Sequence, residues 1–174
     1  GSHLSLYWDI FRDYVLNGQI PKLPNTYIPT LSVRKIRSVV RLITQSPTMT
    51  YISLANHLGI SVATADNTVR DLSNIGLVDS QRILGSFESL CPNPQSATEK
   101  IIDFLRSHTV YIHTKDLIET GGTPTLSTIE LSTRDEYSFV SIDKRTLRTY
   151  IRKIIVYCLE FGLLARRGHL FELS

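Results

Sequence analysis

The residues best suited to chemistry in this sequence are arginines and lysines near its C-terminal end. Residues 143–169 contain seven basic side chains and two acidic ones, whereas the whole chain has 19 basic and 16 acidic residues. The basic set is Lys144, Arg145, Arg148, Arg152, Lys153, Arg166 and Arg167. Such a local excess attracts phosphate, and arginine can also bind a guanine edge with two hydrogen bonds. The segment predicts contact with a polyanion, although a solvated charged surface would contain the same residues.

Helical periodicity separates the arginines from an apolar face. Residues 144–161 predict a helix capped by Asp143, whose buried side comprises Leu147, Ile151, Ile154, Ile155 and Cys158. At about 100° per residue, Arg145, Arg148 and Arg152 fall on a separate stripe. A helix with one buried face and arginines on another suits the major groove of DNA. Arg166 and Arg167 stand before Gly168-His169, where we expect a wing tip that reaches backbone phosphate or the minor groove.

No pattern in the sequence indicates catalysis. Phosphate-binding glycine loops and the nucleophile motif of hydrolases are missing. The histidines are scattered, and no cysteine or clustered carboxylate joins His108 and His113 to complete a zinc site. Cys91 and Cys158 have neither metal-binding nor redox spacing, and a buried thiol is the simplest interpretation of Cys158. We expect no enzyme activity, no cofactor, no catalytic residue and no metal site.

Composition sets the broad class of protein. Of 174 residues, 42% are hydrophobic and 20% charged, which favours a packed core over disorder. The longest apolar runs are far shorter than the roughly 18 residues that cross a bilayer, so no membrane is expected. The cysteine pattern favours a reducing, intracellular compartment, either cytoplasm with nucleoid or nucleus. A net charge of +3 is too small to establish a nucleic-acid partner by itself.

Residues 33–84 contain a regular series of helix signals. We predict helices at 33–45, 52–58 and 62–75, the first and third capped by Ser32 and Ser61, with Gly59 and Gly76 as stops. Short strands at 77–78 and 82–84 follow. The segment resembles the winged helix-turn-helix superfamily, whose turn pattern is matched by Leu54, Ala55, Leu58, Gly59, Ile60, Ser61, Val69, Leu72, Gly76, Leu77 and Val78. The resemblance implies a winged-helix fold and either DNA or protein binding.

The recognition helix implied at 62–75 is less basic than the later one. It has Arg70, but also Asp66 and Asp71. Its candidate DNA contacts are Thr64, Asn67, Thr68 and Arg70, and a structural or protein-facing role is the alternative for this helix. A secondary contact to DNA backbone or to an acidic partner is expected from Arg34, Lys35, Arg37 and Arg41, which lie on the first predicted helix, 33–45.

The rest of the chain predicts a second, divergent copy. Residues 1–3 resemble a cleaved tag, and 4–31 are expected to form a helix at 4–16 and a proline-containing arm pinned by Tyr27 and Ile28. The first winged-helix domain then covers 32–86, a linker 87–95, and the second domain 96–174. In the second domain Ser96 and Glu99 cap a helix to 107, and another helix spans 114–120. An insertion at 121–142 is expected to form a hairpin, with strand-like alternation at 129–131 and 137–142. A single extended helical domain is the alternative.

The sequence therefore predicts a mainly α-helical protein with small β wings, organised as tandem winged-helix domains. The favoured function is non-catalytic binding of double-stranded DNA, as a transcription regulator, a replication or plasmid initiator, or a DNA-targeting subunit. The alternative is a protein–protein interaction module, in contact with a protein partner or with further domains of a longer protein. The fold resemblance does not choose between these two functions, because function depends on the site and not on the fold. The oligomeric state is left open.

Overall fold

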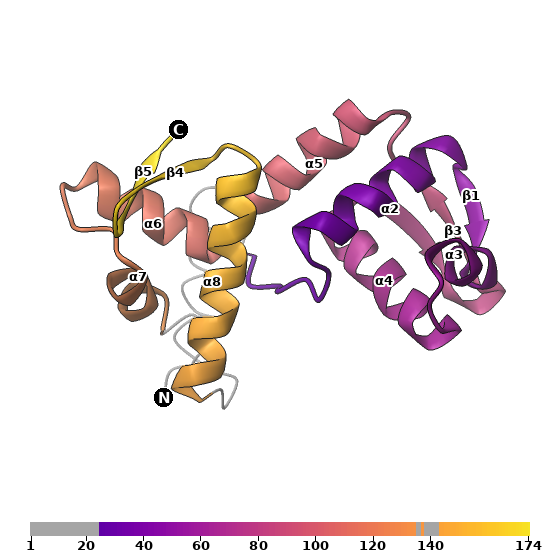
Figure 1. Cartoon of the computed structure of the whole chain (residues 1–174), viewed down its shortest axis with the longest axis horizontal. Coiled ribbons are helices and arrows are strands. Elements are labelled where there is room, and N and C mark those ends of the chain that lie inside the picture. Colours follow the sequence, from indigo (N-terminus) through magenta and orange to yellow (C-terminus); the bar gives the residue numbers. More distant parts are fainter. Residues whose placement is uncertain (1–24, 135–136, 138–142) are drawn as a thin grey trace, which may run out of the picture.

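The computed structural model describes residues 25–134, 137 and 143–174, and these are mainly helical with two small antiparallel sheets (Figure 1). The predicted helix within residues 4–16 lies outside the described residues. In chain order the elements are α2 (Val33–Gln45), β1 (Thr48–Thr50), α3 (Tyr51–Leu58), α4 (Val62–Ile75), β2 (Val78–Gln81), the 3₁₀ turn η1 (Arg82–Leu84), β3 (Ser86–Ser89), α5 (Pro94–Arg106), α6 (Thr109–Glu119), α7 (Leu126–Thr133), α8 (Lys144–Glu160), β4 (Leu164–Arg167) and β5 (Leu170–Leu173).

The first half of the chain has the helices that its caps predict. Ser32 and Ser61 accept hydrogen bonds from backbone N–H groups in the first turns of α2 and α4. Gly59 and Gly76 end α3 and α4 with φ angles of 62° and 84°, which favour glycine because it lacks a Cβ atom. Leu72 of α4 is fully buried, as its phase predicts.

The strands of this half differ from the prediction. Residues 82–84 form the η1 turn between β2 and β3, whereas the prediction made them a strand. β3 lies in the centre of a three-stranded sheet, with β2 on one side and the unpredicted β1 on the other. The predicted strands were placed too early because alternation in such short segments does not fix a boundary.

Residues 87–95, which were expected as a linker, contribute most of β3 and the start of α5. Asn93 caps α5 by accepting the Ser96 N–H, and Pro94 occupies the first turn, where its missing N–H does no harm. The predicted cap at Ser96 is therefore three residues late. α5 lies between the two groups of elements in Figure 1. Its residues Ile101, Phe104 and Leu105 belong to one cluster of buried apolar side chains, which also includes side chains from both halves of the chain.

The second half consists of α6, α7 and α8 followed by the β4–β5 hairpin. α6 starts at Thr109, five residues before the predicted helix at 114–120. Residues 126–133 form α7, so the strand expected at 129–131 is wrong. Thr125 and Thr128 form a reciprocal capping box, which stabilises a helix start there. Most of the second predicted strand, at 137–142, lies outside the described residues.

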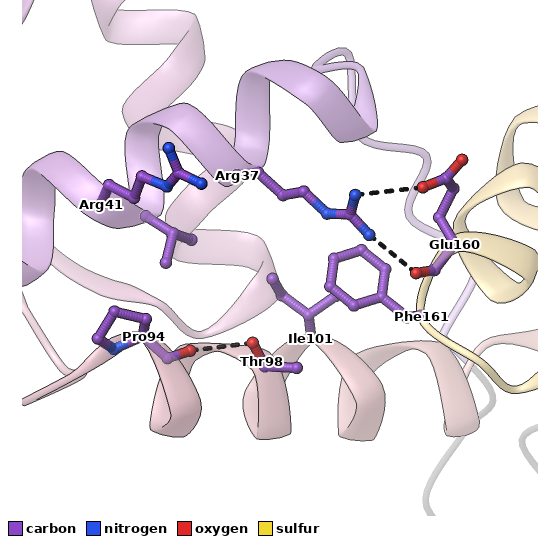
Figure 2. A pocket seen from close by; sticks show the side chains of 8 residues that line it. Arg37, Arg41, Pro94, Thr98, Ile101, Glu160 and Phe161 are labelled. Carbon is purple, nitrogen blue, oxygen red and sulfur yellow. Dashed lines mark hydrogen bonds and ion pairs between the residues drawn. The ribbon is translucent and has the colours of Figure 1, made fainter.

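Arg37 connects α2 to the end of α8 (Figure 2). Its guanidinium lies 3.3 Å from the Glu160 carboxylate, donates to the Glu160 backbone oxygen and stacks over the Phe161 ring. The adjoining cavity of about 360 Å³ is lined by α2, α5 and the end of α8. Arg37 is thus part of a contact between sequence-distant helices.

The arm at Asn25–Leu31 connects four helices. Asp71 of α4 accepts hydrogen bonds from the Tyr27 hydroxyl, the Thr30 hydroxyl and the Leu31 N–H. Lys153 and Tyr157 of α8 donate to the backbone oxygens of Thr30 and Leu31. Asn25 also pairs with the α5–α6 junction, by accepting the Thr109 N–H and donating to the Ser107 oxygen. Tyr27 and Ile28 pack against the core, which confirms that they pin the arm.

Candidate nucleic-acid interface

α8 presents three distinct faces to its surroundings. Its core face buries Leu147, Ile151, Ile154, Ile155 and Cys158, as predicted. Its second face holds Lys153 and Tyr157, which contact the Asn25–Leu31 arm. Its third face is exposed and contains Arg145, Arg148, Thr149, Arg152 and Val156. We call this third face the arginine stripe.

The three arginines of the stripe are available to an external partner. All three side chains are exposed, and no ion pair involves them among residues 25–134, 137 and 143–174. They occupy positions i, i+3 and i+7, so they span about two helical turns, or roughly 10 Å. That separation matches contacts to successive base pairs or phosphates in a groove.

Asp143 fixes the first turn of α8. Its Oδ1 accepts the N–H groups of Arg145 and Thr146, and its Oδ2 accepts the Thr146 hydroxyl. These hydrogen bonds, above all those from Thr146, lower the pKa of the Asp143 carboxyl. The carboxylate also offsets the positive end of the helix dipole. The helix start is therefore well defined, which fixes where Arg145 and Arg148 project.

The hairpin after α8 carries Arg166 and Arg167 near its turn. Arg166 pairs with Phe171 and Arg167 with Leu170 across the two strands. Gly168 takes a φ of 62° in the turn, and the Arg166 Nε donates to its backbone oxygen at 2.9 Å. Both arginines are exposed, and within the part of the chain that the structure describes the Arg166 side chain makes this internal contact whereas the Arg167 side chain makes none, so Arg167 is the freer of the two.

Lys153 differs from the other basic residues of α8. Its Nζ donates to the Thr30 oxygen at 2.8 Å, and burial lowers the pKa of its ammonium group. It lies about 80° away from the centre of the arginine stripe, at about 100° per residue. The structure therefore places Lys153 in an internal contact, with Arg145, Arg148 and Arg152 on the neighbouring exposed face. Lys144 is exposed at the start of the helix.

The predicted contacts on α4 are divided between surface and interior. Thr64 and Asn67 are exposed, and they line a groove of about 490 Å³ together with Thr30, Lys35 and Ser38. Thr68 is buried, with 3% exposure, and its hydroxyl donates to the Thr64 oxygen. Arg70 is exposed and lies 3.4 Å from Asp66. Thr64 and Asn67 are therefore the uncharged candidates that lie on the surface of α4, while Arg70 is paired with Asp66.

Asp71 has a role that the sequence reasoning missed. It was expected to make the α4 surface negative, but its side chain is buried and binds the arm. The signal was present in the sequence, because Asp71 falls within the helical arc that also contains Thr68, Leu72 and Ile75. On the exposed face of α4, Asp66 is balanced by Arg70.

The basic residues of α2 also separate by role. Arg34, Lys35 and Arg41 are exposed, and no ion pair involves them within the described part of the chain. Arg37 binds Glu160 and Phe161 instead. The secondary surface therefore reduces to Arg34, Lys35 and Arg41.

The remaining candidate side chains, His108 and Cys158, are both buried in the fold. His108 is fully buried and its ring contacts the Tyr27 backbone oxygen. Burial raises the pKa of the Cys158 thiol to about 12, which keeps it protonated and unreactive. The described ranges contain no group of three or more side chains arranged to hold a metal ion. Nor does any helix within them have the length and apolar character that a bilayer span requires.

Comparison with models of known protein families and with curated proteins finds no match to this chain.

Proposed function

We propose that this protein binds double-stranded DNA without catalysing a reaction, using α8 and the β4–β5 hairpin as its main contact surface. The observation that carries the proposal is the arginine stripe, in which three exposed guanidiniums on one helical face have no ion pair in the described residues. Exposed arginines in this arrangement suit a strongly anionic partner whose phosphates are regularly spaced.

The order of the elements supports a tandem winged-helix arrangement. In the first half α2, α3 and α4 precede the β2–β3 hairpin, and in the second half α6, α7 and α8 precede β4–β5. A recognition helix followed directly by a hairpin presents both to the same duplex. We propose α8 for the major groove, with Arg148 at base edges and Arg167 at backbone phosphate. A regulator, a replication or plasmid initiator, or a DNA-targeting subunit would each use such a surface.

The experiment is a salt titration of binding to random and enriched duplexes. In the test variant Arg145, Arg148 and Arg152 become alanine. The matched control replaces three other exposed basic residues, Arg106, Lys115 and Arg134, so that the total charge change is equal. The test variant should lose about 100-fold or more in affinity at low salt, and its salt slope should fall by about two to three.

The control should keep most of the affinity, because its residues lie outside the proposed contact surface. If the test variant binds duplex DNA as tightly as the parent protein at low salt, α8 does not contact DNA and the proposal fails. If both variants lose affinity equally, the attraction depends on net charge and the proposed site is wrong.

A second candidate function, protein–protein interaction, is favoured by the first hairpin. Asp79 and Glu88 are exposed and directly paired across β2 and β3, and no ion pair involves them among the residues described. Two adjacent carboxylates repel a phosphate backbone. At the tip, Ile83 is 100% exposed and Leu84 is 73% exposed. This chemistry suits a protein surface with apolar and basic groups.

The two candidates predict different results for the hairpin tip. If this hairpin is a protein-binding surface, changing Ile83 and Leu84 to serine should leave DNA affinity and salt slope at the parental values. If the double variant loses affinity for every duplex, the hairpin is a DNA contact and the protein-binding role is refuted.

A further inference from the structure

Thr149 lies in the arginine stripe between two of its arginines. It is four residues after Arg145 and three before Arg152, so each arginine is one helical turn away on the same face. Its side chain is exposed. A groove contacted by the two arginines therefore also contacts Thr149.

The hydroxyl of Thr149 is already committed inside the helix. Its Oγ1 donates to the Arg145 backbone oxygen at 3.0 Å. Since the hydroxyl has only one hydrogen, this leaves the side chain with a methyl group and acceptor lone pairs to offer a partner. Thr149 is thus unable to donate to a base while this bond is made, but it can make an apolar contact.

The matching group in the major groove is the C5 methyl of thymine. Among the four bases only thymine displays an apolar group there, whereas guanine offers the two acceptors that arginine prefers. We infer that Thr149 is a specificity-determining residue that contacts a thymine methyl, beside guanines bound by arginines of the stripe. This inference rests on the proposed DNA-binding function and adds the base class that α8 selects.

The test uses duplexes enriched by selection with the parent protein. Each thymine of the preferred site is replaced in turn by deoxyuridine, which removes only the C5 methyl and keeps the pairing. Binding is measured for the parent and for two variants, Thr149→Ser and Thr149→Val. Serine keeps the hydroxyl and removes the methyl, whereas valine keeps the methyl and removes the hydroxyl.

The parent protein should lose about fourfold in affinity at one deoxyuridine position, because one buried methyl contributes about 0.8 kcal/mol. Thr149→Ser should bind the thymine duplex about fourfold more weakly and show no further loss with deoxyuridine at that position. Thr149→Val should keep the parental sensitivity. Any other thymine in the site is an internal control, since its substitution should affect all three proteins alike.

Three results would overturn the inference: a preferred site without thymine, no position at which the parent responds to deoxyuridine, or a Thr149→Ser variant that is as sensitive as the parent at every position. In each of these cases the loss of affinity by the triple arginine variant would still stand, so DNA binding by α8 would survive. If the triple variant instead binds like the parent, the proposed function itself is wrong.

Discussion

Acidification should destabilise this protein through one buried histidine, His108. Its Nε2 lies 3.1 Å from the Tyr27 backbone oxygen, and its Nδ1 lies 3.2 Å from the Val110 nitrogen. A carbonyl oxygen only accepts, so Nε2 carries the hydrogen, and Nδ1 accepts the Val110 N–H as the cap of α6. The bond at Nδ1 needs the neutral ring, because protonation would place a hydrogen on the nitrogen that accepts from Val110, whereas the Nε2–H can donate to Tyr27 in either form. Burial lowers the pKa of His108 from 6.5 to about 4.

The direction and size of the effect follow from that pKa. The folded protein binds the proton less readily than the unfolded chain, so the stabilising contribution is complete above about pH 6.5 and decreases as the pH falls. The difference of about 2.5 pKa units corresponds to about 3 kcal/mol in total. About 2 kcal/mol of this should be lost by about pH 5, and the loss should level off below about pH 4.

The measurement is urea unfolding at several pH values for the parent and for His108→Asn. Asparagine can still cap α6 with its side-chain oxygen, but it does not titrate. Other ionisable groups contribute to both proteins and largely cancel in the difference. The parent's advantage at about pH 7.5 should shrink by about 2 kcal/mol at about pH 5. His57→Asn, at an exposed position, is the control and should follow the parent. A constant difference between parent and His108→Asn would refute the argument.

Two further predictions concern stability. Asp71→Asn should lower the free energy of unfolding by about 2–4 kcal/mol, because one amide oxygen replaces two carboxylate oxygens that accept three hydrogen bonds. A loss below about 0.5 kcal/mol in urea unfolding would mean that the arm contributes little. Leu72→Ala should cost about 2–5 kcal/mol because its side chain is fully buried, and thermal or urea unfolding would measure this. Val62→Ala, at an exposed position of the same helix, should change stability by no more than about 0.5 kcal/mol; equal losses would contradict the burial of Leu72.

The helices that were predicted well are those whose ends have local chemical causes. Ser32, Ser61 and Asp143 cap α2, α4 and α8, and each satisfies backbone N–H groups within its own first turn. Gly76 stops α4 through its own φ angle. Such signals depend on a few neighbouring residues, so they can be identified without knowledge of the rest of the fold.

The features that were missed depend on residues far away in the chain. β1 has three residues and exists because β3 pairs with it, and alternation within 129–131 was too short to distinguish a strand from α7. Among the candidate site residues, the exposure of Arg145, Arg148 and Arg152 followed from periodicity. The internal role of Lys153 did not, because its partner Thr30 lies 123 positions earlier.

The hydrogen bonds of the arm also constrain when the molecule can complete its fold. Lys153 reaches the Thr30 oxygen and Tyr157 reaches the Leu31 oxygen across 123 and 126 positions of sequence. Contacts between such distant segments form late, because closing a long loop has a large entropic cost. During synthesis the arm leaves the ribosome before α8, which follows only after more than a hundred further residues. Asp71 can bind the arm well before α8 exists. The arm therefore passes from a partly bonded to a fully bonded state only when α8 has left the ribosome.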